Sequence, residues 1–136
     1  MTSRGLRNNN PLNIRKSGEP FAGEVPSSDP AFKQFLSMAY GYRAAFVILG
    51  TYLGRGLNTI EKIVKTWAPP TENNTESYIN NVVLRSKVPR SKVLTNMSGN
   101  DYIAVVAAMS WSENGVPAVM NDVVSGFILQ TKIRKI

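Results

Sequence analysis

The chain contains neither cysteine nor histidine among its 136 residues. The absence of cysteine excludes disulfide bonds and thiolate metal sites. The absence of histidine excludes Ser-His-Asp and Cys-His catalysis, as well as zinc sites with imidazole ligands. None of the remaining patterns requires a metal ion or a cofactor, and we expect neither.

Acidic residues are also scarce, with nine Asp and Glu against 16 Lys and Arg. Without histidine, an enzyme built on this chain has to use one or two of these carboxylates as its acid or base. The nine are Glu19, Glu24, Asp29, Glu61, Glu72, Glu76, Asp101, Glu113 and Asp122.

Long hydrophobic runs are missing as well. No window approaches the roughly 18 apolar residues of a membrane-spanning helix. The longest apolar helical run, residues 42–53, is too short and contains Arg43. The first residues lead into asparagines instead of the apolar core of a secretory signal peptide. We therefore expect no membrane span and no signal peptide, and export would need another route.

The formal net charge of +7 favours anionic partners such as nucleic acid, anionic lipid or a cell envelope. The basic residues are scattered, apart from groups at 85–92 and 132–135. A nucleic-acid-binding protein is therefore one alternative. No aromatic–basic motif or recognition-helix signature supports it, and a scattered excess is typical of a solvated surface. We expect no nucleic-acid partner.

Apolar residues recur at helical spacing through most of the chain after residue 39. Capping residues and Gly or Pro breakers delimit the segments. The pattern predicts helices over residues 40–55, 59–68, 75–85 and 99–113, and a shorter one over 117–125.

The first 38 residues are rich in Asn, Gly, Pro and Ser and predict a loop with a short β-hairpin. We expect strands near residues 12–15 and 22–25, with Gly18 and Pro20 in the turn between them. The fold class is thus mainly α (α+β), in a single domain. Its expected parts are a loop and hairpin over 1–38, a helical part over 39–125 and a basic tail over 126–136.

The segment over residues 4–15 carries three consecutive asparagines followed by a proline. This composition disfavours a helix and predicts a short strand or a turn. Amide side chains both donate and accept hydrogen bonds without charge, which suits ligands rich in hydroxyl and acetamido groups, such as glycans. The alternative is a solvated tail, since disorder concentrates at chain termini.

Glu113 continues the apolar stripe of Tyr102, Val106 and Met109 at helical spacing. It also lies at the expected C-terminus of its helix, where the dipole disfavours negative charge. Burial and the dipole both favour the protonated form of a carboxyl group, which is the form a general acid needs. The alternative is that this last-turn side chain reaches solvent.

Glu24, on the expected hairpin, is a candidate for a second carboxylate, because glycoside hydrolysis normally uses two. The alternative interpretation of Glu24 is an exposed strand residue.

Trp67 is interpreted as a core residue. Tyr78 either packs inward or directs its hydroxyl into a cleft.

Several short motifs follow one another along the chain, at residues 4–15, 23–25, 32–35, 40–44, 67–69 and 72–75. In this order they resemble a family of small phage and prophage virion (structural) proteins that is thought to be lysozyme-like. The resemblance implies a lysozyme-like helical domain, other virion proteins as partners, and a location in the virion or in the host cytoplasm before delivery to the envelope.

A second resemblance concerns the flagellar-type peptidoglycan glucosaminidases. Residues 10–15, the hairpin and residues 32–35 are similar to a block that in those enzymes follows a catalytic Ala-x-x-Glu-Ser-Gly helix end. Here residues 108–115 are similar to that helix end, with Ser110 in place of Ala and Asn114 in place of Ser. The resemblance implies a circular permutation that moves the catalytic helix to the other end of the chain, which nearby termini would permit.

The resemblances imply cleavage of the glycan strand of peptidoglycan, of lysozyme, glucosaminidase or lytic transglycosylase type. The alternative is a phage structural or glycan-binding protein that keeps the fold without activity. The implied roles are general acid for Glu113, possible second carboxylate for Glu24, and substrate binding for Asn10, Asn13, Arg15 and Tyr78.

Overall fold

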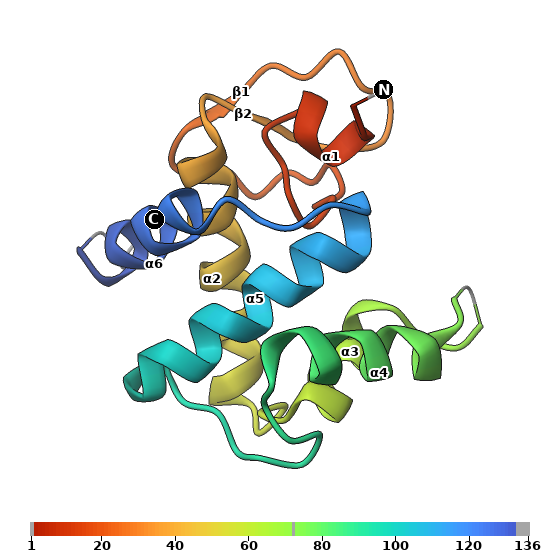
Figure 1. Ribbon diagram of the computed structural model, residues 1–136. Coiled ribbons are helices and arrows are strands. Elements are labelled where there is room, and N and C mark those ends of the chain that lie inside the picture. The colour runs from red at the N-terminus through yellow and green to blue at the C-terminus, as the bar shows by residue number, and fades with distance from the viewer. Residues whose placement is uncertain (1, 72, 133–136) are drawn as a thin grey trace.

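The computed structural model describes residues 2–71 and 73–132, which are mainly helical (Figure 1). The helices are α1 (Arg4–Arg7), α2 (Met38–Gly54), α3 (Ile60–Trp67), α4 (Thr75–Ser86), the 3-10 helix η1 (Asn96–Ser98), α5 (Gly99–Asn114) and α6 (Met120–Lys132). Two short strands, β1 (Glu24–Val25) and β2 (Gln34–Phe35), form an antiparallel pair.

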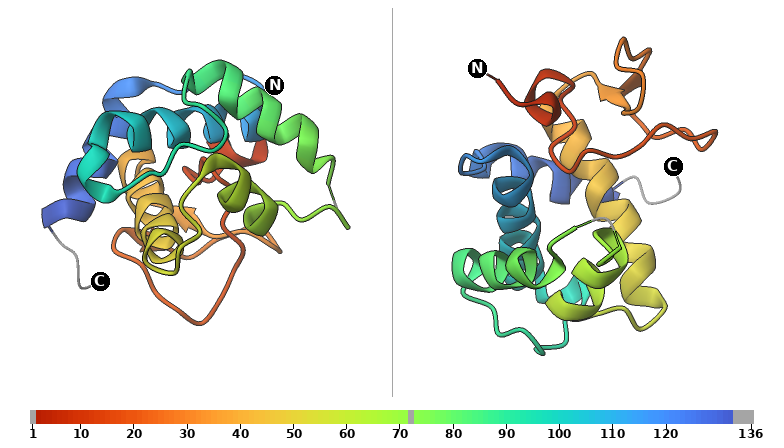
Figure 2. Two further views of the ribbon diagram at one scale, coloured as in Figure 1. Left: turned by 90° about the horizontal axis from the view of Figure 1, so that it is seen from below. Right: turned by 90° about the vertical axis from the view of Figure 1, so that its right-hand side faces the viewer.

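Helix α2 is the central helix, along which the other parts of the molecule are arranged. The N-terminal segment with β1 and β2 lies at one end of α2, and α3 and α4 lie toward the other (Figures 1 and 2). α6 packs along α2, and α5 packs against α4. The core between these helices contains a T-shaped aromatic cluster, in which the Phe46 ring lies 5.0 Å from Tyr102 and 5.3 Å from Phe127.

The mainly α class and the four longer helices are confirmed. Each of α2–α5 begins and ends within two residues of its predicted bounds, because local signals set the ends. The side chains of Ser37, Thr59 and Asn74 accept hydrogen bonds from the first turns of α2, α3 and α4. Within the described residues, no helix combines the length and the apolar character needed to cross a membrane.

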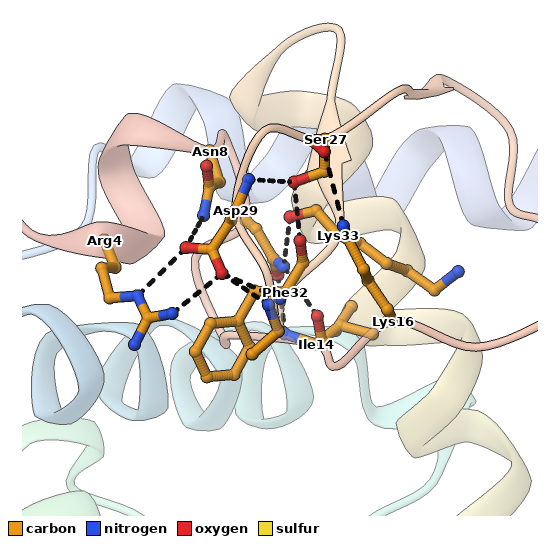
Figure 3. A network of polar contacts seen from close by, with 10 residues as sticks. Arg4, Asn8, Ile14, Lys16, Ser27, Asp29, Phe32 and Lys33 are labelled. Atoms are coloured by element: carbon orange, nitrogen blue, oxygen red, sulfur yellow. Dashed lines mark hydrogen bonds and ion pairs between the residues drawn. The ribbon is translucent and has the colours of Figure 1, made fainter.

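The predicted hairpin pairing was wrong. Val25 pairs with Gln34, whereas the expected partner segment 12–15 contributes only an isolated bridge between Arg15 and Phe32. The turn lies later than Gly18 and Pro20, because Asp29 accepts hydrogen bonds from the backbone nitrogens of residues 31 and 32. Figure 3 shows this carboxylate, which also binds Arg4 and Asn8.

The asparagine-rich opening is an ordered, packed segment and not a solvated tail. It begins with the single helical turn α1, which the composition did not predict and which Ser3 caps. Asn9 and Asn13 then adopt left-handed backbone angles, φ 51° and 54°, a conformation that asparagine tolerates better than most residues. Asn9 also donates to the Phe35 carbonyl, which ties the segment to β2.

The last predicted helix was too short, and the prediction of a tail from residue 126 was wrong. α6 begins at Met120 and continues through residue 132, while residues 133–136 lie outside the described part. Tertiary contacts explain the extra length. Val123 and Gly126 are buried, and Phe127 joins the aromatic cluster of the core.

Gly126 is a point of close approach between α6 and α2. A Cβ atom there would lie 2.5 Å from the Tyr42 Cβ and 2.9 Å from the Ala39 carbonyl oxygen. Helix propensity alone would favour Gly126→Ala by about 1 kcal/mol. Overpacking opposes it and costs about 1–3 kcal/mol. We expect net destabilisation in urea unfolding. Gly54→Ala is the control and should lose no stability, because apart from the chain neighbours and the backbone of α2 itself no atom lies within 4 Å of its Cβ position.

Candidate functional site

Three segments that lie far apart in the sequence meet at the carboxylate of Glu113, in the last turn of α5. Its Oε1 accepts a hydrogen bond from Asn13 Nδ2 at 2.9 Å. Its Oε2 accepts one from the Tyr78 hydroxyl of α4, also at 2.9 Å. The side chain is partly buried, so the alternative of a freely solvated last-turn carboxylate does not hold.

Asn114 fixes the end of α5 against the N-terminal segment. Its Nδ2 donates to the Pro11 carbonyl at 2.8 Å, and its Oδ1 accepts from the Ser3 hydroxyl at 2.7 Å. Gly115 ends the helix in a left-handed conformation, φ 75°. The Asn114 side chain therefore links two parts of the chain that are more than 100 residues apart, and this link brings Asn13 to Glu113.

Ser110 ties α5 to α2, because its hydroxyl forms a hydrogen bond of 2.8 Å with the Tyr42 hydroxyl in the buried core. Ser110 and Asn114 are the two positions at which the sequence departs from the glucosaminidase motif. In this structure both departures make specific contacts that orient the helix carrying Glu113.

Tyr78 supports the carboxylate from α4. Desolvation, followed by the nearby charge of Glu113 and the hydrogen bond to it, raises the pKa of Tyr78 well above its usual value. The phenol therefore stays protonated near neutral pH. A hydroxyl both donates and accepts, so Tyr78 can donate to an ionised Glu113 or accept from a protonated one.

A cleft of about 580 Å³ opens beside Glu113. Its walls combine aromatic faces with amide, guanidinium and carboxylate groups, a mixture that suits a ligand with both apolar faces and hydroxyl groups. The Tyr52 and Trp67 rings lie with their centroids 6.4 Å apart. The cleft is lined by Leu12, Asn13, Ile14, Arg15, Phe32, Ile48, Tyr52, Trp67, Ala68, Asn73 and Glu113.

Of the residues proposed from the sequence, Asn13, Arg15 and Glu113 line this cleft, and Tyr78 lies against Glu113. The Asn13 amide contacts the Glu113 carboxylate directly, so the two side chains lie together at the wall of the cleft. Because Asn13 and Tyr78 both donate to Glu113, the structure places them as supports of the carboxylate.

Asn10 and Glu24 are not brought to the cleft. Asn10 is fully buried, and its amide bonds to the backbone of Ile14 and Lys33. The Glu24 carboxylate pairs with the buried Lys33 ammonium at 2.9 Å and accepts from the backbone nitrogen of Phe21. Both side chains hold the N-terminal segment together, because a buried cation or amide requires such partners.

The aromatic lining of the cleft was not predicted from the sequence. Trp67 packs against the hydrophobic core, as interpreted from the sequence, but it is only partly buried and also lines the cleft together with Tyr52. The two prolines that follow Trp67 mark a helix end, which is where a side chain can leave the core. The contributions of Phe32 and Ile48 carry no sequence signal.

No metal centre is apparent within the described residues, where no group of three or more Asp and Glu side chains is placed to bind an ion. Among the described residues that line the cleft, Glu113 is the carboxylate. Among the described residues, Glu113 is therefore the one acidic group in the cleft that could take part in catalysis.

Comparison with known proteins gives a relative from a virus of bacteria. Protein P5 of Pseudoalteromonas phage PM2 is 42% identical over 131 residues, and the match covers 92% of this chain and 80% of the relative. No protein-family model matches the chain.

Proposed function

The chain belongs to the family of Protein P5 of Pseudoalteromonas phage PM2, and from this premise we propose that it is a phage enzyme that cleaves the glycan strand of peptidoglycan. The observation that carries the proposal is the Glu113 carboxylate, held by Asn13 and Tyr78 at the wall of an aromatic, amide-lined cleft. A lysozyme-like domain with a circularly permuted catalytic helix is part of this proposal.

Glu113 is the proposed general acid. In its protonated form it would donate its proton to the oxygen of the glycosidic bond, and the departing sugar would leave as an alcohol. The ionised carboxylate would then accept a proton from the incoming nucleophile. Asn13 and Tyr78 donate to its two oxygens and so stabilise the carboxylate after the proton has left.

A single carboxylate favours mechanisms that need no second one. The acetamido oxygen of the sugar can attack the anomeric carbon in its place, as in substrate-assisted glycosidases. Either water or a hydroxyl of the same sugar would complete the reaction, which corresponds to hydrolysis or to lytic transglycosylation. Glu24 is not proposed as the second group, because its carboxylate is bound to Lys33.

The experiment that tests the proposal is digestion of purified cell-wall sacculi by the purified protein, followed by mass analysis of soluble fragments. Release of glycan fragments supports it. Fragments with a free reducing end identify hydrolysis, whereas anhydro ends, lighter by one water, identify transglycosylation. Failure to release fragments from sacculi that hen-type lysozyme digests would refute the proposal.

A glycan-binding phage protein without turnover is the second candidate. The observation that favours it is that both oxygens of Glu113 already accept hydrogen bonds from the protein. Such a protein would bind sacculi in a pelleting assay and release no fragments. A virion location and contacts with other virion proteins are compatible with both candidates and are proposed with them.

Tyr78→Phe tests the support of Glu113. The variant removes the donor to Oε2 but keeps the ring, so we expect kcat to fall about tenfold with little change in KM, since the lost bond acts on the reacting group. Sacculus digestion rates measure it. Tyr40→Phe, which makes the same atomic change outside the cleft, should retain full activity. Equal rates for wild type and Tyr78→Phe would contradict the support role.

A further inference from the structure

Arg15 stands at the rim of the cleft, where it also lines a neighbouring hollow of about 320 Å³. Its side chain is exposed, and its guanidinium lies 5.3 Å from the centre of the Phe32 ring. The isolated β-bridge joins the backbones of the same two residues. The bridge fixes the backbone of Arg15 beside Phe32, and the cation–π contact favours this position of the guanidinium before any ligand arrives.

A second arginine, Arg4, also lies over the Phe32 ring, but its charge is paired within the protein. Arg4 lies 4.6 Å from the Phe32 centroid and donates two hydrogen bonds, of 3.0 and 2.8 Å, to Asp29 (Figure 3). The hydrogen bond from Arg4, followed by one from the Ala31 backbone, holds the pKa of Asp29 well below its usual range. The charge of Arg4 is therefore compensated within the protein.

The charge of Arg15 is not compensated in this way. Within residues 2–71 and 73–132, its guanidinium takes part in no hydrogen bond or ion pair. Glu19 lines the neighbouring hollow but forms no ion pair with it. The donors of the guanidinium, which match a carboxylate in geometry, are thus available to a ligand in the cleft.

We propose that Arg15 binds a carboxylate of the substrate and makes the cleft select carboxylate-bearing glycans over neutral ones. This inference rests on the proposed function, because it takes the ligand of the cleft to be a peptidoglycan strand. Such strands carry carboxylates on the stem peptide or, where the peptide is absent, on the lactyl group of the sugar, whereas chitin carries none. Among the described residues that line the cleft, Arg15 carries the positive charge, so the anionic groups of the strand would lie toward Arg15.

Calorimetric titration of the full chain tests the selectivity in a Glu113→Gln background that prevents turnover. The probes are neutral chitin tetrasaccharide, a peptide-free muramic acid tetrasaccharide with free lactyl carboxylates, and the same saccharide bearing stem peptides. Adding Arg15→Gln should weaken binding of at least one charged probe about tenfold and leave the chitin probe unchanged. Which charged probe is affected identifies the source of the carboxylate.

Lys16→Gln is the matched control, because it removes the same charge from the adjacent, exposed position that does not line the cleft. It should bind every probe as the parent does. Equal weakening for charged and neutral probes, an unchanged charged probe, or no binding of the charged probes would overturn the inference. If wild type binds the charged probes selectively through Arg15 but releases nothing from sacculi, the catalytic proposal fails and the selectivity stands.

Discussion

Replacing Glu113 with glutamine is expected to lower the rate of the proposed peptidoglycan cleavage by about 10²–10⁴-fold, the usual contribution of a general acid. Glutamine has nearly the same shape. Its carbonyl oxygen can still accept from Asn13, and its amide can donate to the Tyr78 oxygen. The two contacts to α4 and the N-terminal segment are therefore kept, while the transferable proton is lost.

Release of soluble fragments from sacculi measures this effect, and urea unfolding verifies that the variant remains folded. The matched control is Glu76→Gln on α4, where an exposed carboxylate pairs with Arg90 at the surface. Such surface ion pairs contribute little to stability, so this control should retain both activity and fold. A Glu113→Gln variant as active as wild type would eliminate Glu113 as the acid.

Replacing Asn10 with alanine is expected to cost about 3 kcal/mol of unfolding free energy. The fully buried amide donates to the carbonyls of Ile14 and Lys33 and accepts from the Ile14 nitrogen, at 2.9–3.0 Å. Removing it leaves the Ile14 nitrogen without its acceptor and takes one donor from each of the Ile14 and Lys33 carbonyls, in a place that water does not reach. The Ile14 carbonyl keeps its hydrogen bond from the Lys33 backbone nitrogen at 2.9 Å.

Urea unfolding measures the loss, with Asn80→Ala on the exposed face of α4 as a control expected to be neutral or slightly stabilising. The same variant also tests the role that the sequence predicted for Asn10. If Asn10 contacted glycans, Asn10→Ala would weaken glycan binding and leave the unfolding curve unchanged.

The helices could be predicted from the sequence because their signals are local. Apolar spacing defines the buried faces of α2 and α5, and the caps Ser37 and Asn74 mark helix starts. The extent of α6 could not be predicted from the sequence, because the second half of α6 is stabilised by the packing of Gly126 and Phe127 onto α2. The two-residue strands carry too short a pattern to specify a partner.

The candidate site could be predicted in part, because the position of Glu113 also depends on a local signal. Helical spacing put Glu113 on the buried stripe of its helix, a property of one segment. Its partners Asn13 and Tyr78 come from other segments, and no periodicity relates them to it. Trp67 and Tyr52 were not distinguished from the core residues beside them, because aromatic spacing is the same in a core and in a cleft wall.

The sequence by itself determined which residue types could serve as a general acid and where α2, α3, α4 and α5 lie. Without histidine or cysteine, acid catalysis falls to a carboxylate, and residue spacing singled out Glu113. Only the tertiary structure decided the roles of the asparagines. Asn10 is buried as a backbone partner, whereas the left-handed turn at Asn13 directs the same type of side chain to Glu113. Side-chain roles of this kind depend on long-range contacts, which local composition does not encode.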